Sequence, residues 1–324
     1  MSSIKLVTNL HNWAELNLDD LAEFSFKARQ SRPETFNNKR TLERERRIIN
    51  LQKQFSPSFV VVTSKGNKML GWLSFDLESP NKVEIGRWLP AVLEGEEEDE
   101  VLAALIEASK DYCRKIHYSR LEVSFNIRDQ GERQAYKIYR RWYEAHNVRI
   151  KDEVIYMFRN LSENDNTGIS TPEAFETKSI SEINDDELYL CYHEAFTKSK
   201  NRIFQDQTES ERRDYFFDYY SKSKPFIKEA SLVLKKLKKR AIIGVTVVRP
   251  RGGDAHLSLL AIHPDYQRRG LGKFLLKLVI KRVFKQGFKS ISLGVDIENP
   301  AIILYQKVGF VSTSHIITHS WKTK

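Results

Sequence analysis

Apolar and polar positions alternate with helix and strand periods along the chain, most clearly in its second half. Lysines recur at every fourth position from Lys273 to Lys285, while Leu275 and Val279 belong to an apolar stripe. This spacing predicts a helix over 271–285 with one face in solvent. Runs rich in β-branched residues between turn-forming residues predict strands. The second half is expected to hold strands at 174–180, 230–234, 241–248, 255–262, 290–295 and within 310–321, and helices at 185–198, 209–220, 271–285 and 299–308.

The first half repeats this order of elements. Its expected strands lie at 4–7, 59–63, 69–75, 83–89, 120–125 and in the run ending at 158, and its expected helices at 19–29, 41–54, 101–116 and 130–144. Between the halves, residues 161–173 are polar and turn-rich, which predicts a linker. A repeat of roughly 170 residues is too long for a solenoid unit and indicates a duplicated domain. The sequence therefore predicts a mixed α+β chain with domains at 1–160 and 174–324 and a linker at 161–173.

Composition narrows the class of protein. The 324 residues are 40% hydrophobic, and no run approaches the roughly 20 apolar residues that span a bilayer, so we expect no membrane partner. The first residues lack the apolar segment of a secretory signal. Cys113 and Cys191 are too far apart to suggest a metal site or a disulfide framework. These features predict a cytoplasmic protein without a bound metal.

The net charge of +10 is compatible with an anionic partner. Nucleic acid, an acidic protein and a phosphorylated cofactor each fit it, and solubility alone explains it equally well. The chain has no zinc-finger spacing and no RNA-binding signature motif, so nucleic acid is a partner that no motif supports. The sequence gives no indication of the oligomeric state.

The most specific local feature is the stretch 267–272, which reads QRRGLG between a strand-like run and the helix expected at 271–285. The start of a helix presents unpaired N–H groups and a partial positive charge. Glycine lets the backbone approach an anion closely and adopt left-handed angles. This turn therefore predicts a pyrophosphate site at the start of the helix.

Two sequence blocks, in this order, resemble the GNAT superfamily of acyl-CoA-dependent N-acyltransferases. The first, 259–273, reads LLAIHPDYQRRGLGK and fits the family's strand, turn and Q/R-x-x-G-x-G/A loop. The second, 299–310, reads NPAIILYQKVGF and fits the family's later block of Asn, Ala, Leu-Tyr and Gly-Phe. The resemblance implies two tandem GNAT-like domains, each a mixed, mostly antiparallel twisted sheet flanked by helices. It also implies transfer of an acetyl group from acetyl-CoA, as co-substrate, to a primary amine by direct attack in a ternary complex.

The same resemblance assigns the contacts to CoA. In this family the strand before the loop splays from its neighbour, and the pantetheine arm bonds to that strand's backbone, while the helix start holds the pyrophosphate. The CoA-binding residues implied are Leu260, Ala261, Ile262, Gln267, Arg268, Arg269, Gly270, Leu271, Gly272, Lys273, Asn299 and Tyr305. An ordinary strand–helix turn is the alternative for the glycines, and a helix cap is the alternative for Asn299.

Catalytic roles follow from the second block. Tyr305 resembles the family's tyrosine near the CoA sulfur, where a hydroxyl acts as general acid towards the departing thiolate; a purely packed tyrosine is the alternative. Some members carry a glutamate base where this chain has Gly294. Nearby Asp296 and Glu298 fit a solvated strand end, and His256 is a candidate base that also fits a surface strand. Water or a backbone carbonyl serves in other members.

The first half departs from the pattern at the position of the phosphate loop. Residues 91–100 read AVLEGEEEDE, with one glycine and a dense acidic run that would repel a pyrophosphate. Acids also favour a helix start, so the run has a purely structural explanation as well. Tyr136 or Tyr139 falls near the position of Tyr305, but without a phosphate loop neither is assigned a catalytic role. We therefore expect a degenerate N-terminal copy and an intact C-terminal copy.

Tandem chains with one intact copy include the mycothiol synthase type, to which residues 294–299 have a short likeness. The acceptor is expected to be a small-molecule or peptide amine. Two other classes stay open: a non-catalytic module that binds acyl-CoA or a partner, and a tRNA-dependent aminoacyl transferase, which also uses paired GNAT folds. The intact loop at 267–272 argues against the latter, because that reaction would not need to hold a CoA pyrophosphate.

Overall fold

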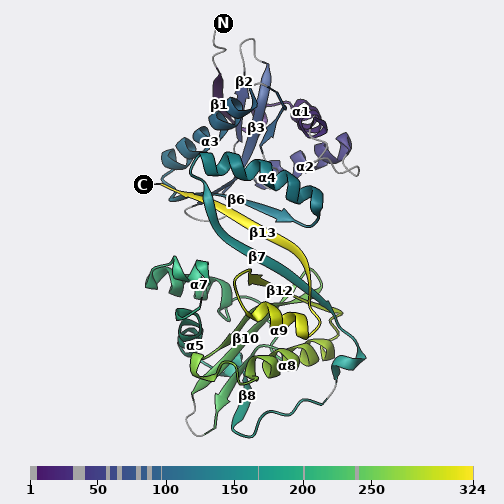
Figure 1. Ribbon diagram of the computed structural model, residues 1–324, viewed down its shortest axis with the longest axis vertical. Helices are drawn as coiled ribbons and strands as arrows, with labels where there is room; N and C mark the ends of the chain where they lie inside the picture. Colours follow the sequence, from purple (N-terminus) through teal and green to yellow (C-terminus); the bar gives the residue numbers. More distant parts are fainter. Residues whose placement is uncertain are drawn as a thin grey trace. The chain divides into compact units, whose positions relative to one another are not determined.

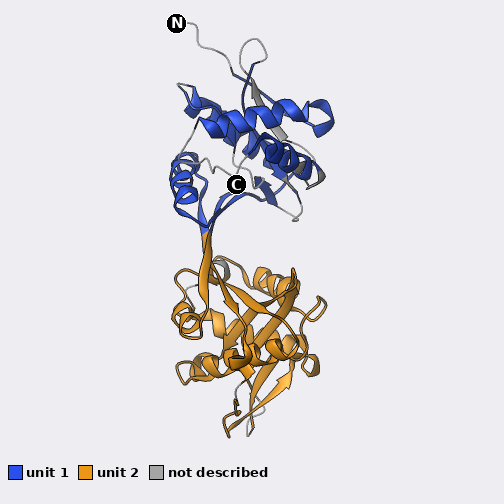
Figure 2. Cartoon of the chain, turned by 90° about the vertical axis from the view of Figure 1, so that its right-hand side faces the viewer, with its two compact units in different colours: residues 1–151, 316–324 blue, residues 152–315 orange. Residues whose placement is uncertain are grey.

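The chain divides into two compact units, which Figure 2 shows in separate colours. Unit 1 comprises residues 1–151 and 316–324, and unit 2 comprises residues 152–315. The computed structural model describes residues 6–31, 41–55, 59–63, 68–77, 82–85, 90–95, 97–166, 168–199, 201–237 and 241–323. Within these ranges, no helix combines the length and the apolar character that crossing a bilayer requires.

Unit 1 contains a sheet with the strand order β1-β2-β3-β4-β6-β13, of which β13 spans Val311–Lys322. In this sheet β4 and β6 are parallel, and the pairs from β1 to β4 are antiparallel. The apolar stripes of α3 and α4 pack on this sheet, where Leu105 and Tyr143 meet Phe75 and Phe125. Its elements are β1 (Val7–His11), α1 (Leu18–Gln30), α2 (Leu42–Phe55), β2 (Phe59–Thr63), β3 (Met69–Asp76), β4 (Lys82–Ile85), β5 (Ala91–Val92), α3 (Glu98–Lys115), β6 (Arg120–Ile127) and α4 (Gln130–Ala145).

Unit 2 has the strand order β7-β12-β11-β10-β9-β8, in which only the described pair β11 and β12 is parallel. Two apolar clusters flank it: one contains Leu293 and Leu276 of α8, and the other contains Val245, Tyr192 of α5 and Phe216 of α7. Figure 1 labels these helices beside the strands of the unit. Its elements are β7 (Arg149–Asn160), β8 (Phe175–Ser179), α5 (Asp185–Thr197), α6 (Arg202–Gln205), α7 (Glu209–Tyr220), β9 (Leu232–Lys236), β10 (Ile242–Arg251), β11 (Asp254–Ile262), α8 (Leu271–Lys285), β12 (Ser290–Asp296), α9 (Ala301–Lys307) and β13 (Val311–Lys322). The predicted mixed α/β fold with a mostly antiparallel sheet is confirmed.

Two long strands run from one unit into the other. β7 begins in unit 1 and pairs in unit 2 with β12, antiparallel, from Val154 opposite Asp296 to Asn160 opposite Ser290. β13 begins in unit 2, and its residues 316–322 belong to unit 1, where β13 follows β6 in the strand order. Each sheet therefore contains a strand that starts or ends in the other unit.

This division differs from the predicted boundaries. The stretch 161–173, expected to link the domains, lies inside unit 2, as do residues 152–160 of β7. The terminal residues 316–324, expected in the C-terminal domain, belong to unit 1. Periodicity locates a strand along the chain, but the strand's neighbours depend on residues far away in the sequence, so the exchange leaves no local signal.

Most predicted elements lie within a few residues of the observed ones, and α8 has the predicted bounds. α3 begins at Glu98, three residues earlier than expected, because the acidic run forms its first turn. α6 and β5 were not predicted. Part of the strands expected at 4–7 and 83–89 falls on residues 4–5 and 86–89, which lie outside the described ranges.

Candidate active site

The turn between β11 and α8 has the geometry that the glycine pattern predicted. Arg268 and Gly270 adopt φ angles of 58° and 81°, and this left-handed backbone turns the chain into the helix. The side-chain Nε2 of Gln267 donates to the carbonyl of Ile262 at 2.9 Å, which ties the turn to the end of β11. Gly270 caps α8 without a side-chain bond, and a Cβ there would meet no atom within 4 Å. The start of α8 therefore opens into free space.

Electrostatics at this helix start favour an anion. The first turn of α8 has no acidic residue, and the exposed Arg268, Arg269 and Lys273 surround it. The Arg269 guanidinium lies 5.4 Å from the ring centroid of Tyr266, which orients it beside the turn. Unpaired N–H groups of the first turn add a partial positive charge. The site thus fits a pyrophosphate in both charge and space.

β11 and β12 pair only over a short stretch and then separate. Among the described residues their register runs from Ala255 opposite Ile291 to Leu257 opposite Leu293, although β11 continues to Ile262. A β-bulge at Ser258 accompanies the separation, because β10 pairs with β11 on both sides of that residue but skips it. A bulge bends the strand and increases its twist, which directs the rest of β11 away from β12.

Where β11 separates from β12, some backbone N–H and C=O groups of β11 point to the side from which β12 has turned away. The N–H of His263 donates to the carbonyl of Ile243 at 2.8 Å, so the backbone groups of His263 and Ala261 point towards β10. By the same alternation, those of Leu260 and Ile262 point away from β10. The Ile262 carbonyl is taken by Gln267. Of the three strand residues predicted to contact CoA, Leu260 therefore presents its backbone most freely.

Gly272 and Leu271 connect this turn to the rest of the unit. A Cβ at Gly272 would lie 3.6 Å from Leu304 of α9 and 3.8 Å from Ile262, which are ordinary contacts. Packing within the protein therefore does not require a glycine at this position. Leu271 is buried and packs with Leu275 and Ile243, which anchors the helix start on the sheet.

Tyr305 lies on α9 within an apolar cluster that includes residues of β11 and β12. It is 8% exposed and belongs to the same cluster as Leu257 and Leu293, the last pair before β11 and β12 separate. Its ring meets that of Phe310 edge-on, with centroids 5.9 Å apart. Burial raises the pKa of Tyr305 to about 12, so the phenol keeps its proton at neutral pH. A protonated hydroxyl is what a general acid requires.

Asn299 stabilises the start of α9. Its side-chain oxygen accepts a hydrogen bond from the N–H of Ala301 at 2.9 Å, and its carbonyl accepts one from Ile302 at 3.2 Å. The helix-cap alternative is therefore present in the structure. This cap fixes the direction in which α9, and with it Tyr305, leaves β12.

His256 lies on the paired part of β11. Its Nδ1 is 3.0 Å from the hydroxyl of Ser292, and its ring stacks on that of Tyr156 with centroids 6.1 Å apart. Burial, with a smaller contribution from the nearby Arg251 charge, lowers the pKa of His256 to about 4. The imidazole is therefore neutral at pH 7 and a weak acceptor for the proton of an ammonium group.

Tyr156 is a neighbour of the site that sequence reasoning missed. It lies opposite Gly294 in the register of β7 and β12, and its hydroxyl accepts a hydrogen bond from Arg251 at 2.8 Å. A Cβ at Gly294 would lie 3.6 Å from the Tyr156 ring and 3.2 Å from Val154. The Tyr156 ring is thus in ordinary van der Waals contact with that position, and Val154 is the neighbour that would have to move. No local signal could reveal it, because β7 precedes β12 by more than a hundred residues.

Asp296 is the second neighbour that the sequence misplaced. The carboxylate was expected at a solvated strand end, but the residue is only 7% exposed. One oxygen accepts a hydrogen bond from the N–H of Glu298 at 2.8 Å. Glu298 itself is exposed, as expected. Asp296 shares the face of β12 with Gly294, because alternate residues of a strand point to the same side.

Unit 1 has an acidic helix start at the place of the phosphate turn. Glu98, Asp99 and Glu100 occupy the first turn of α3, directly after Glu97; Glu96 lies outside the described residues. Asp99 accepts a hydrogen bond from the Trp142 indole at 3.1 Å, which ties α3 to α4. The acids therefore stabilise the helix start, and their charge disfavours an anion there.

The two tyrosines at the place of Tyr305 in unit 1 are part of its core. Tyr139 is buried among apolar residues. The hydroxyl of Tyr136 is 3.1 Å from Nε2 of the fully buried His319, whose Nδ1 is 3.1 Å from the carbonyl of Val148. The carbonyl can only accept, so His319 donates from Nδ1 and accepts the Tyr136 proton at Nε2. Both ring nitrogens are thus satisfied within the core.

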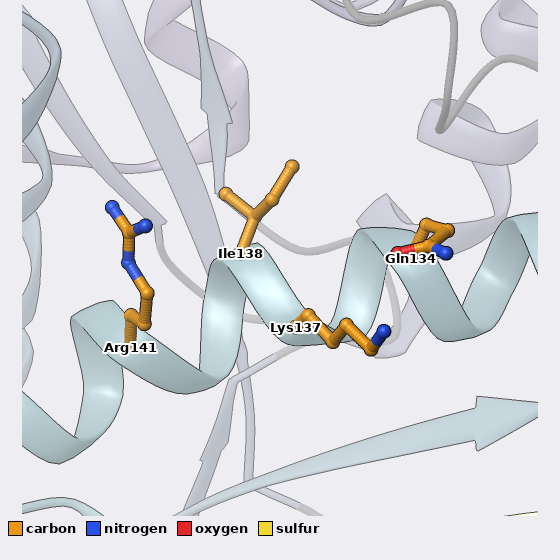
Figure 3. Close-up of a pocket in the computed structure, with 4 residues that line it drawn as sticks. All are labelled: Gln134, Lys137, Ile138 and Arg141. Atoms are coloured by element: carbon orange, nitrogen blue, oxygen red, sulfur yellow. The ribbon is translucent and has the colours of Figure 1, made fainter.

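A shallow pocket lies on one face of α4 in unit 1, where Figure 3 shows its lining side chains. Its volume is about 210 Å³, and Gln134, Lys137, Ile138 and Arg141 line it. None of these is a predicted site residue, and every predicted site residue lies in unit 2. The pocket is therefore part of unit 1, whereas the predicted site residues belong to unit 2.

Comparison with known proteins finds similarity over the segment that contains the turn at 267–272 and Tyr305. Residues 187–310 match the model of the acetyltransferase (GNAT) family. The [Ribosomal protein bS18]-alanine N-acetyltransferase of Haemophilus influenzae is 37% identical over 82 residues, which are 25% of this chain and 56% of that protein. The mycothiol acetyltransferase of Clavibacter michiganensis is 29% identical over 89 residues, 27% of this chain and 29% of that protein. The matched stretches span from about a tenth to about half of the curated relatives' own lengths.

Solved structures extend the similarity of fold to both halves. A GCN5-related N-acetyltransferase from Sphaerobacter thermophilus aligns over 98% of this chain and 95% of its own, with a TM-score of 0.59 and 15% identity. A tandem GNAT protein from the clavulanic acid biosynthesis pathway aligns over 98% of both chains, with a TM-score of 0.50 and 13% identity. At these identities the likeness concerns the fold alone. The chain therefore has a tandem GNAT-like fold and contains a GNAT acetyltransferase domain, matched over residues 187–310.

Proposed function

We propose that unit 2 transfers an acetyl group from acetyl-CoA to a primary amine. The observation that carries this proposal is the start of α8, which is open, free of acids and turned by the left-handed Gly270, next to a strand that separates from its neighbour. An anion-binding helix start beside an unpaired strand edge suits a ligand with a pyrophosphate and an extended amide-bearing arm. These are the two parts of CoA that a protein backbone can hold.

Each part of the cofactor has a proposed partner. Backbone N–H groups of residues 268–273 would hold the pyrophosphate, with Arg268, Arg269 and Lys273 adding charge. The backbone of Leu260 would bond to the pantetheine arm along the separated edge of β11. Acetyl-CoA supplies the acyl carbon as a thioester.

Tyr305 is the proposed general acid. Its pKa of about 12 means that the hydroxyl carries a proton to give to a departing sulfur at neutral pH. His256, with a pKa of about 4, is at most a weak base, so water at the open position beside Gly294 is the better proton acceptor for the incoming ammonium group. The amine then attacks the thioester directly, without an acyl-enzyme.

The names of the relatives support an amine as acceptor. One acts on an alanine of a ribosomal protein, and another carries mycothiol in its name. Peptide amines and small-molecule amines are therefore the two classes that an assay should contain. Unit 1 is proposed to be a degenerate copy that binds no CoA, because acids replace the open helix start.

The decisive experiment combines a binding and a turnover measurement. Calorimetry with acetyl-CoA tests the turn at 267–272, and release of free CoA thiol with a panel of peptide and small-molecule amines tests transfer, with mass spectrometry of the acceptor. We expect binding, and thiol release that depends on an amine. If acetyl-CoA binds but no amine is acylated, and Tyr305→Phe does not change the release of CoA thiol, unit 2 is a binding module. If acetyl-CoA does not bind, the proposal fails entirely.

A further inference from the structure

The polar face of α8 carries more positive charge than a pyrophosphate at the start of the helix would need. Residues 266–295 contain eight Lys and Arg residues and no Asp or Glu. Lys277, Lys281 and Lys285 follow Lys273 at intervals of four residues, and we call these three the lysine stripe. Four residues advance a helix by about 6 Å. The stripe therefore begins about 6 Å beyond Lys273, the last residue assigned to the pyrophosphate, and continues for about 12 Å.

The described part of the chain does not neutralise the lysine stripe. Two of its lysines are exposed and Lys281 is half-buried. Among the residues that the structure describes, no carboxylate forms an ion pair or a side-chain hydrogen bond with any of the three. The turn η2 (Glu163–Asn166) contacts α8, but its Asp165 is paired with Arg159. The charge of the stripe is therefore directed to the solvent, where it attracts anions.

The face around the stripe lacks the apolar anchors that a protein or a membrane would use. No large hydrophobic side chain of α8, all of which is described, is exposed. Protein interfaces are depleted in lysine and depend on buried aromatic and arginine anchors. A helix that lies on a membrane inserts its apolar face, but the apolar face of α8, with Leu276 and Val279, is packed in the core of unit 2. A phosphodiester backbone requires positive charge alone.

We propose that the lysine stripe binds the phosphate backbone of a single-stranded nucleic acid. The stripe is one row of charges, and one row can follow the phosphates of one strand, whereas a duplex presents two strands on either side of a groove. Lysine is a compact point charge without the fork that reads base edges. The half-buried Arg282 on the same helix donates to the carbonyl of Glu229 at 2.8 Å and is therefore not available for bases. Binding is accordingly independent of base sequence.

Fluorescence anisotropy of the full chain with a labelled oligouridylate of about 12 nucleotides measures this binding. The stripe variant removes three charges and keeps the helix, because glutamine and lysine have similar helix propensities. Its changes are Lys277→Gln, Lys281→Gln and Lys285→Gln. The control variant removes three charges from exposed lysines that form no ion pair among the described residues. Its changes are Lys115→Gln, Lys198→Gln and Lys228→Gln.

We expect the stripe variant to bind the oligouridylate at least about tenfold more weakly than wild-type protein at about 50 mM salt. Each lysine that contacts a phosphate of a single strand contributes about 0.7 to the slope of log K against log salt concentration. The stripe variant should therefore show a slope smaller by about 2, and the control variant should keep the wild-type affinity and slope. The melting temperature should not fall in either variant, since the lysines make no side-chain contact that the change removes.

Three results would overturn the inference. Equal oligouridylate binding by the stripe variant and wild-type protein would leave the stripe as a solvated face. An equal loss in the control variant would mean that net charge alone attracts the oligonucleotide. Tighter binding of a poly-glutamate peptide, a phosphatidylserine vesicle or a DNA duplex, lost in the stripe variant, would assign the stripe to a different partner. None of these measurements involves acetyl transfer, so the inference stands or fails separately from the proposed function.

Discussion

Tyr156 and Gly294 lie opposite each other on β7 and β12, and a Cβ at 294 would be 3.6 Å from the tyrosine ring and 3.2 Å from Val154. The position at which some GNAT members carry a glutamate base is therefore exposed and is tight only towards the Val154 side chain of the preceding strand. The Tyr156 ring is held there by the bond from Arg251 and by stacking on His256. A side chain at 294 thus competes with Val154 for space and lies in ordinary van der Waals contact with Tyr156.

This competition predicts a strong coupling between the two positions. Gly294→Glu should lower the free energy of unfolding by about 1–3 kcal/mol in the wild-type background, because the added side chain forces its neighbours apart. The same change together with Val154→Ala, which removes the tight neighbour of position 294, should cost much less. Urea unfolding of the two single variants and the double variant measures the coupling. The double variant should also transfer acetyl about tenfold faster than Val154→Ala alone, since it gains a carboxylate base.

Tyr156→Phe is the matched control for this cycle. It removes the bond from Arg251 but leaves Val154 in place, so Gly294→Glu should be as harmful with Tyr156→Phe as in wild-type protein. An equal cost of Gly294→Glu in all three backgrounds would show that Val154 does not limit the space at position 294.

Gly270 and Gly287 allow the phosphate role to be separated from backbone strain. Both have φ above 80° and open space at the Cβ position, at opposite ends of α8. Alanine at either position should cost about 1–2 kcal/mol of stability, because a left-handed backbone is unfavourable for a residue with a Cβ. Only Gly270→Ala should weaken acetyl-CoA binding, and Gly270→Glu should abolish it by steric and charge conflict. Calorimetry and urea unfolding of the variants give both quantities.

Gly287→Glu is the binding control, because its charge lies at the far end of the helix. Undiminished acetyl-CoA affinity in Gly270→Glu would remove the turn at 267–272 from the binding site.

The sequence predicted those features that depend on neighbouring residues. The lysine spacing and the glycine turn determine α8 and its start locally, so their bounds and the left-handed Gly270 agree with expectation. The acids at Glu98 and Asp99 likewise start a helix where charge alone suggested one. A few neighbouring residues determine turns and helix ends of this kind.

Features that depend on residues far apart along the chain could not be predicted from the sequence. β7 could be predicted as a strand, but not as the partner of β12. The position of Tyr156 next to Gly294 therefore could not be predicted. Asp296 could be placed at the end of a strand, but its burial depends on the neighbouring β7. The low pKa of His256 has the same origin, because burial of its ring depends on that neighbouring strand as well.

Tyr305→Phe should separate chemistry from binding. We expect kcat to fall about 100-fold, because the general acid is lost, with KM for acetyl-CoA unchanged. Stability should not fall, since burial without a hydrogen bond is the cause of the raised pKa of Tyr305. Steady-state kinetics and a thermal melt check both parts. Tyr136→Phe in unit 1 is the control and should leave kcat unchanged; a Tyr305→Phe enzyme with full kcat would make Tyr305 a packing residue only.

Binding stoichiometry tests the proposed difference between the units. Wild-type protein should bind one acetyl-CoA per chain, because the first turn of α3 carries acids where α8 carries none. Neutralising Glu98 and Glu100 to glutamine should not create a second site, since unit 1 also lacks the glycine turn. Calorimetry gives the stoichiometry directly, and two equivalents bound to wild-type protein would contradict a degenerate unit 1.

His256 should make the stability of unit 2 depend on pH. Its pKa is about 4 in the folded protein and about 6.5 when unfolded. Between these values the unfolded chain binds the proton and the folded chain does not, so stability is full above pH 6.5 and falls as the pH drops towards 4. The loss at pH 4 is on the order of 3 kcal/mol.

Urea unfolding checks this pH dependence. His256→Gln should lose less stability between pH 7 and pH 4.5 than wild-type protein does. The control is His117→Asn, which replaces an exposed histidine of unit 1 and should behave like wild type. An identical pH dependence in His256→Gln and wild-type protein would mean that the imidazole is hydrated and free to accept a proton, which would restore His256 as a base.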